Sequence, residues 1–323
     1  MFTQDIARRL DMRPGQEDYG IDLRPPATGP SAARFLFATT NTDDKIRVMD
    51  LDAFAADDTT AWVEFEDGNT ASPTNTAPYA ATYHASTGDL YFSNYDSGQI
   101  FRYAYDGSGD RDDPASYTRT AFKAAGSKVW ALHATDASGT PMLYWSTYTS
   151  GYKIERVPIA SPGDAATLVV ESTSAKGNPA GLTVIGDDLY YALQNSFTGG
   201  SSEAALRVVD LTGTIGSGVI GTAVDSIIHA FGVGQVPDEV IYGANGGSHG
   251  IKRYGPLSDS PTASTLDSAV SAGYCTDIEV TGTTMYAALS AVGGGIEIYD
   301  LSDDSVVDTI PTAGWRPRGI ALA

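Results

Sequence analysis

The sequence predicts an all-β protein folded as a six-bladed β-propeller, whose N- and C-terminal strands close the ring and which an N-terminal arm precedes. Three observations predict this fold. The chain of 323 residues is rich in glycine and tyrosine and has no long stretch of helical periodicity. A pair of alternating apolar and polar runs joined by a short turn recurs six times. A short apolar run precedes five of these pairs, and a sixth such run ends the chain.

The clearest repeat is GDLYFSNYDSGQIFRYAY, residues 88–105, in which alternation stops at Asp-Ser-Gly and then resumes. Period-two alternation on both sides of a glycine-containing turn is typical of paired strands. The six repeats occupy 34–51, 88–105, 141–159, 187–211, 238–257 and 283–301. Their equivalent aromatic residues, spaced 44 to 54 positions apart, are Phe37, Tyr91, Tyr144, Tyr190, Tyr242 and Tyr286. A period near 50 residues indicates propeller blades, so each repeat is predicted to supply the two middle strands of a blade.

The short apolar runs are predicted to form the crowded inner strands around the propeller axis. They occupy 78–84, 128–134, 180–186, 226–233, 275–282 and 316–323. No strand pair follows the last run, and no inner strand precedes the first pair. The C-terminus is therefore predicted to supply the inner strand of the first blade, which removes exposed sheet edges. The predicted outer strands are 61–67, 117–124, 166–172 and 305–312, with weaker signals at 216–224 and 263–270.

Residues 1–33 lie outside the repeats, and 34–323 form the predicted propeller. The stretch 3–12 fits a short helix, and 13–30 reads as extended chain punctuated by proline. Such an arm buries little apolar area by itself, so we expect it to be held by its own propeller or, preferably, by a neighbouring subunit. Its predicted anchoring side chains are Phe2, Ile6, Leu10, Tyr19 and Ile21.

The net charge of −20 excludes two classes of partner. With 40 acidic and 20 basic residues, the surface repels nucleic acid and anionic membranes. No apolar run is long enough to insert into a membrane. The acidic balance fits a halophilic or marine origin and equally an ordinary acidic protein. The first twenty residues lack the apolar core of a secretory signal, so we expect either a virion or extracellular assembly reached by another route, or the cytoplasm.

The Leu-Tyr strand starts, the glycine-containing turns and the Asp-Leu strand ends at 50–51, 210–211 and 300–301 resemble the broad six-bladed YVTN/NHL/gluconolactonase-like group over residues 34–323. The resemblance implies architecture only, because the group includes hydrolases, scaffolds and receptors. Its gluconolactonase-like members bind a divalent cation in the channel through a Glu, two Asn and an Asp. The corresponding positions here hold Tyr79, Trp130, Asn178, Asp225, Asp277 and Arg318.

This departure from the metal-ligand pattern of the gluconolactonase-like members disfavours their enzymatic activity for this chain. We therefore expect no cofactor, and keep as the alternative a metal-dependent hydrolase with calcium or another divalent cation held by Asn178, Asp225 and Asp277. A second metal candidate is the glycine-rich loop 106–113, which carries Asp106, Asp110 and Asp112. Because Arg111 stands where an EF-hand loop requires glycine, an acidic solvated turn is the preferred interpretation.

No catalytic residue is predicted. The sequence lacks a G-x-S-x-G nucleophile elbow. His84, His133 and His229 fall at matching ends of inner strands, and such recurrence predicts a structural role because a catalytic residue is needed only once. Strand alternation predicts that Cys275 and Asp277 point the same way, with no histidine beside them, so Cys275 is expected to be a buried apolar residue.

The turns between second and third strands are predicted to gather aromatic rings and amides on one face. These residues are Asn94, Tyr95, Tyr148, Tyr152, Asn195, Phe197, Asn245 and His249. Rings that cover sugar C–H groups beside amides that bind hydroxyls are typical of carbohydrate sites, although Tyr95 and Tyr148 are repeat-equivalent and packing is the alternative. The predicted function is a non-enzymatic recognition or structural module: a spike, fibre or decoration protein of a phage or archaeal virion, anchored to other structural proteins by its arm and binding host-surface glycan.

Overall fold

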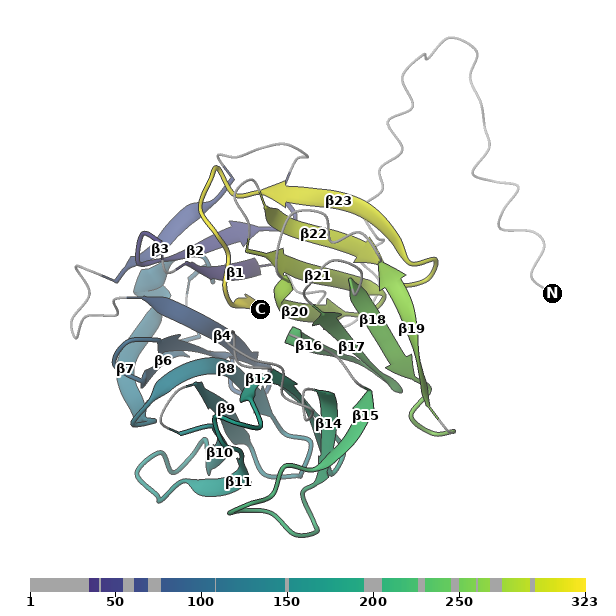
Figure 1. Ribbon diagram of the computed structural model, residues 1–323. Coiled ribbons are helices and arrows are strands. Elements are labelled where there is room, and N and C mark those ends of the chain that lie inside the picture. The colour runs from purple at the N-terminus through teal and green to yellow at the C-terminus, as the bar shows by residue number, and fades with distance from the viewer. Residues whose placement is uncertain are drawn as a thin grey trace, which may run out of the picture. The chain divides into compact units, whose positions relative to one another are not determined.

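The computed structural model describes residues 35–40, 42–54, 61–68, 77–107, 109–148, 151–194, 205–225, 230–244, 250–259, 261–267, 275–290 and 294–323. These residues form six four-stranded antiparallel sheets arranged as blades around a central axis (Figure 1). The predicted all-β, six-bladed propeller is therefore confirmed. The predicted arm lies outside the described residues. Within them, the structure has no helix of the length and hydrophobicity needed to cross a membrane.

Each blade is a meander from an inner to an outer strand. Blade 1 comprises β24 (Ile320–Leu322), β1 (Phe35–Thr40), β2 (Lys45–Asp50) and β3 (Val63–Asp67), and blade 2 comprises β4 (Pro78–His84), β5 (Asp89–Asn94), β6 (Gln99–Tyr105) and β7 (Tyr117–Ala124). Blade 3 comprises β8 (Lys128–Thr135), β9 (Met142–Tyr148), β10 (Lys153–Pro158) and β11 (Thr167–Glu171). Blade 4 comprises β12 (Asn178–Ile185), β13 (Asp188–Gln194), β14 (Ala205–Asp210) and β15 (Thr222–Asp225).

Blade 5 comprises β16 (Ala230–Val236), β17 (Glu239–Ala244), β18 (Ile251–Gly255) and β19 (Thr262–Asp267), and blade 6 comprises β20 (Cys275–Thr281), β21 (Thr284–Leu289), β22 (Gly295–Asp300) and β23 (Ser305–Pro311). The largest shifts from the predicted boundaries are in β15, β16 and β24. The predicted outer strand 216–224 begins only at Thr222. The inner strand predicted at 226–233 is observed as β16, Ala230–Val236. Residues 316–319 precede β24 instead of belonging to it, and Pro317 among them has no N–H to give to a strand ladder.

The last strand closes the ring as predicted. β24 pairs antiparallel with β1, with Phe37 opposite Ala321. The backbones of Phe35 and Ala323 exchange two hydrogen bonds of 3.0 and 2.9 Å, and Thr39 continues the ladder to Gly319. The ladder covers the inner edge of β1, and β24 becomes the innermost strand of blade 1.

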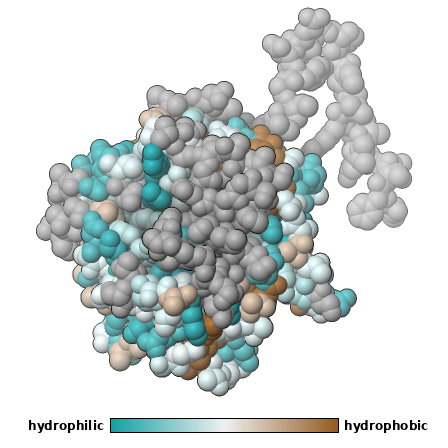
Figure 2. All heavy atoms as spheres, in the orientation of Figure 1, coloured by the Kyte–Doolittle hydropathy of each residue, from teal (hydrophilic) through white to brown (hydrophobic). Residues whose placement is uncertain are grey.

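The apolar core lies between neighbouring blades. The repeated aromatic residues lie at its centre, and Phe37, Tyr91, Tyr144 and Tyr242 are completely buried. Between blades 1 and 2, the Phe37 ring meets Phe65 edge-on with centroids 5.1 Å apart. The described surface in view is mostly hydrophilic or neutral, with scattered apolar patches (Figure 2). The apolar side chains buried between blades stabilise the packing of one blade on the next.

A bulge interrupts the inner strands of five blades near their first residues. The register shifts lie between Pro78 and Ala81, Val129 and Ala131, Pro179 and Leu182, Ala230 and Val233, and Cys275 and Asp277. A bulge inserts an unpaired residue and re-aims the side chains around it. The prediction that Cys275 and Asp277 point the same way was therefore wrong. Cys275 is buried against Gly243 of blade 5, whereas Asp277 lines the central channel.

Candidate functional site

The starts of the inner strands and the ends of the second strands meet on one face of the ring. Cross-strand pairs mark it: Pro78 with Asn94, Lys128 with Tyr148, and Asn178 with Gln194. We call this end of the channel, with the side chains that border these pairs, the mouth. The bulges of β4 and β8 lie here and carry Tyr79 and Trp130.

Four aromatic rings pack together at the mouth. Tyr79 stacks on Tyr95 with ring centroids 4.9 Å apart. Trp130 lies 5.1 Å from Tyr79 and 4.8 Å from Tyr148, which joins blades 2 and 3. Tyr79 is buried, while Tyr95, Trp130 and Tyr148 remain partly exposed. The cluster is therefore packed on its inner side and open on its outer side.

Two cations flank these rings. Lys128 Nζ lies 4.3 Å from the centroid of Tyr95, and Arg318 Cζ lies 5.5 Å from that of Tyr79. Both contacts are within cation–π range. Burial raises the pKa of Tyr79 despite the opposing effect of Arg318, so its hydroxyl stays a neutral hydrogen-bonding group. The mouth thus carries two basic side chains on a protein of net charge −20.

Buried amides without partners lie on the blade 4 side of the mouth. Asn178 is 4% exposed and Gln194 is fully buried, and they face each other across β12 and β13. Among the described residues, Asn178 Oδ1 and both amide atoms of Gln194 have no hydrogen-bond partner, and neither does Ser290 Oγ just after β21. An unsatisfied buried polar group costs about 1–3 kcal/mol, so these atoms point to a bound ligand or ordered water.

The structure brings together some of the predicted loop-face residues and not others. Tyr95 and Tyr148 meet through Trp130. Asn94 is 1% exposed and its Oδ1 accepts the Ser97 N–H at 2.8 Å, so it builds the turn and is not available to a ligand. Tyr152 is partly exposed with φ of 46° and makes no ring contact with the described part of the cluster. The remaining predicted residues lie outside the described residues: Asn195, Phe197, Asn245 and His249, and the arm residues Phe2, Ile6, Leu10, Tyr19 and Ile21.

The alternative metal site does not assemble. Asp225 ends the outer strand β15, where its carboxylate accepts the Tyr242 hydroxyl and lies 3.7 Å from Lys252 Nζ. Asn178 lies at the mouth and Asp277 lies in the channel, so the three side chains do not converge. Among the described residues, no three His, Cys, Asp or Glu side chains are close enough to hold a metal ion.

The aspartate-rich loop between β6 and β7 is held by other contacts. Asp113 accepts the Ala115 N–H at the start of a single 3₁₀ turn, Pro114–Ser116. Arg111 donates to the Tyr83 hydroxyl and stacks on Tyr105. Among the described residues, the carboxylates of Asp106, Asp110 and Asp112 form no group that could hold a metal ion.

Two histidines show different roles. His84 is buried and bonds Thr87 Oγ1 at 2.9 Å and Asp136 Oδ1 at 3.0 Å, which ties blade 2 to blade 3, as a structural role predicts. His133 is not its equivalent, because His133 pairs with Tyr144 whereas Tyr91 pairs with Thr82. His133 instead lines the channel, where burial lowers its pKa to about 4.

Cys275 is not a nucleophile. Its side chain is fully buried, and burial raises the pKa of its thiol, so the neutral form persists. A β-carbon on Gly243 would lie 2.5 Å from its sulfur, which shows how closely blades 5 and 6 pack around it. The prediction of a buried apolar cysteine is confirmed.

Comparison with known proteins confirms the architecture. No family model matches the sequence, and no curated protein matches it. A chain of the nidogen/laminin complex superposes with a TM-score of 0.66 at 15% identity, covering 90% of this chain and 97% of that one. A gluconolactonase from Xanthomonas campestris gives 0.55 at 15% identity, and a luciferin-regenerating enzyme 0.55 at 12%, each covering 75% of this chain and 78% of its own. At these identities the likeness shows the fold alone.

Proposed function

We propose that this protein is a non-enzymatic recognition module of a larger assembly and that its mouth binds carbohydrate. The observation that carries the proposal is that partly exposed aromatic rings and buried amides border the same end of the channel. Tyr95, Trp130 and Tyr148 offer apolar surface, while Asn178 and Gln194 offer hydrogen-bonding groups that no described residue satisfies. A sugar has C–H faces and hydroxyl edges, so it matches both kinds of group.

The proposed setting is a virion of a phage or archaeal virus, in which the protein is a spike, fibre or decoration component. Its arm binds other structural proteins and its mouth faces a host-surface glycan. The strongly acidic composition supports a role without nucleic acid or membrane insertion, and supports a virion or extracellular location. The aromatic mouth favours a recognition role over the hydrolase alternative.

Replacing Trp130 with alanine is expected to weaken glycan binding on the order of tenfold or more, because the tryptophan holds the Tyr79 and Tyr148 rings in one cluster. The measurement is binding of wild type and variant to a panel of immobilised host-surface polysaccharides. Trp62→Ala is the matched control, since Trp62 packs on Trp315 and makes no ring contact with the four aromatic residues of the mouth. The proposal fails if wild type binds no polysaccharide, or if folded Trp130→Ala binds as wild type does.

Deleting residues 1–33 is expected to leave the propeller folded and to abolish its incorporation into the assembly. The ring closes through β24 and β1 without the arm, so the thermal unfolding midpoint should stay close to that of the full chain. Incorporation is measured by co-assembly of each form with the purified particle and electron microscopy. A truncated protein that incorporates normally would show that the arm is not the anchor.

A further inference from the structure

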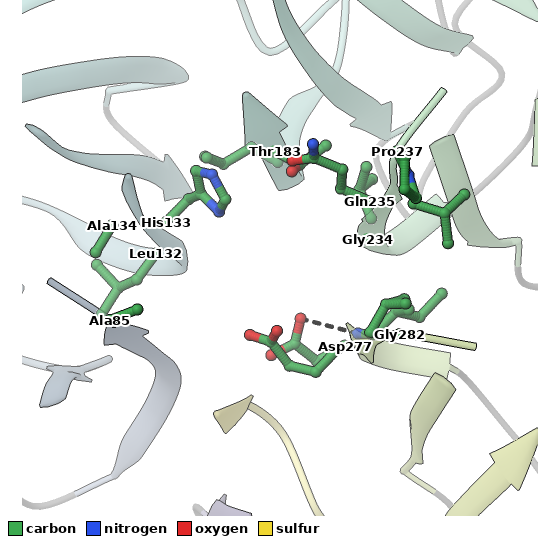
Figure 3. Close-up of a pocket in the computed structure, with 16 residues that line it drawn as sticks. Ala85, Leu132, His133, Ala134, Thr183, Gly234, Gln235, Pro237, Asp277 and Gly282 are labelled. Atoms are coloured by element: carbon green, nitrogen blue, oxygen red, sulfur yellow. Dashed lines mark hydrogen bonds between the residues drawn. The ribbon is translucent and has the colours of Figure 1, made fainter. Parts of the chain in front are cut away.

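The channel contains a second polar site, distinct from the mouth. A cavity of about 540 Å³ is bordered by the inner strands β8, β12, β16 and β20 and reaches the turns at Ala85, Pro237 and Gly282, where inner strands lead into second strands. Its volume is within the range of small-molecule sites. In Figure 3, Asp277 lies across the cavity from His133, Thr183 and Gln235.

The cavity is acidic without a compensating cation. Asp277 and Glu279 both line it, and no lysine or arginine does among the described residues. They pair regularly with Ala288 and Tyr286, so they lie on one face of β20 about 7 Å apart along the strand. Asp277 accepts the N–H groups of Ile320 and Ile278 at 2.9 and 3.0 Å. No hydrogen bond or ion pair to Glu279 is recorded within the described part of the chain.

A hydroxyl on β12 adds a further hydrogen-bonding group. Thr183 is 2% exposed and lines the cavity, and no described residue hydrogen-bonds its hydroxyl. The hydroxyl is therefore available to a ligand or water in the cavity. The His133 Nε2 accepts the Val184 N–H at 3.3 Å, which leaves the proton of the neutral ring on Nδ1 and makes that wall of the cavity uncharged.

We propose that this cavity binds a small organic cation that carries primary ammonium groups. The carboxylates of Asp277 and Glu279 pair with the ammonium groups, and Thr183 and the Gln235 amide accept further N–H bonds. An ammonium has three donors and no acceptor, which suits a wall composed of oxygen acceptors. Two carboxylates spaced along one strand suit a diammonium chain better than a compact metal ion, which needs its ligands to converge.

Binding should strengthen as the pH rises. Among the described residues, the titratable groups that line the cavity are Asp277, Glu279 and His133. Burial raises the pKa of Asp277 to about 7, and burial together with the neighbouring Asp277 raises that of Glu279 well above its usual value. Protonated carboxyls do not attract an ammonium group, so the affinity at about pH 8 is expected to exceed that at about pH 5.5.

The test is calorimetric titration of the full-length protein with putrescine at about pH 8, with uncharged butanediol as the matched ligand. Putrescine is expected to saturate one site, and butanediol is expected not to bind. Glu279→Gln should weaken putrescine binding on the order of tenfold or more. Asp259→Asn, which removes an exposed carboxylate elsewhere, should leave it unchanged. Thr183→Val, which removes the unpartnered hydroxyl, provides a second variant and should also weaken binding.

Four results would overturn the inference: no saturable putrescine binding, equal binding by Glu279→Gln, equal binding of butanediol, or calcium that binds the cavity and displaces putrescine. If both cavity variants fail to fold, a wild-type affinity that does not rise between pH 5.5 and pH 8 would overturn it as well. Failure of the cavity proposal would not contradict the proposed carbohydrate site, because that site lies at the mouth and is tested with a different variant, Trp130→Ala.

Discussion

Replacing Gly319 with alanine is expected to destabilise the folded protein by about 3 kcal/mol or more. A β-carbon at this position would lie 2.5 Å from the Tyr79 carbonyl oxygen, 2.6 Å from the Ala81 nitrogen and 2.8 Å from the Ala80 α-carbon. All three atoms belong to the backbone of β4, so no flexible side chain can move aside. Gly319 leads directly into β24, and relief of the clash would pull this closing strand away from β1.

The matched control is Gly163→Ala, because no atom lies within 4 Å of the added carbon in that turn. Its free energy of unfolding should stay within about 0.5 kcal/mol of wild type. Guanidinium unfolding of the three proteins measures the difference. If both alanine variants unfold at the same denaturant concentration, the first and second blades are not packed as closely as the structure places them.

The architecture could be predicted because each blade has the same local sequence pattern and the pattern recurs along the chain. Period-two alternation around glycine turns marks each strand pair, and the repeated aromatic position marks the blade core, where Tyr91 and Tyr144 are indeed completely buried. Closure followed from an unpaired strand at each end of the chain, which β24 and β1 now satisfy.

The channel could not be predicted to the same depth, because the inner strands are bulged. Strand alternation assumes an unbroken ladder, and one extra residue reverses every later side chain. The bulge of β20 turns Asp277 into the channel and buries Cys275 between blades. No residue type in these strands signals the bulge. The same uncertainty of register made His133 look equivalent to His84.

The mouth was predicted in part. Tyr95 and Tyr148 follow from the repeat, and the structure adds Tyr79 and Trp130 beside them. Gln194 was missed because nothing in a sequence distinguishes a satisfied buried amide from an unsatisfied one. Asp225 was placed near the channel since the predicted outer strand stopped before it. In the structure β15 extends through Asp225, which pairs with Leu206.

Replacing Asp277 with asparagine is expected to remove a pH dependence of folding stability. Burial raises the pKa of this carboxyl to about 7 in the folded protein, against about 3.9 in an unfolded chain. The folded state therefore holds the proton more tightly. The stabilisation is fully present below about pH 4 and is lost as the pH rises to about 7. A pKa shift of this size corresponds to a loss of at most about 4 kcal/mol in the free energy of unfolding. Because Asp277 is partly exposed to the channel, we expect a loss of about 2 kcal/mol.

Asparagine keeps an oxygen that can accept the Ile320 N–H, so the contact between blade 6 and the closing strand survives while the charge is removed. Guanidinium unfolding at about pH 5 and pH 8 gives the test, as the difference in free energy of unfolding between the two conditions. Wild type and the exposed-site control Asp259→Asn should share the same difference, and Asp277→Asn should show a smaller loss at pH 8. An unchanged difference in Asp277→Asn would mean that the carboxylate is already ionised at pH 5, and that the N–H groups of Ile320 and Ile278 outweigh the cost of its burial.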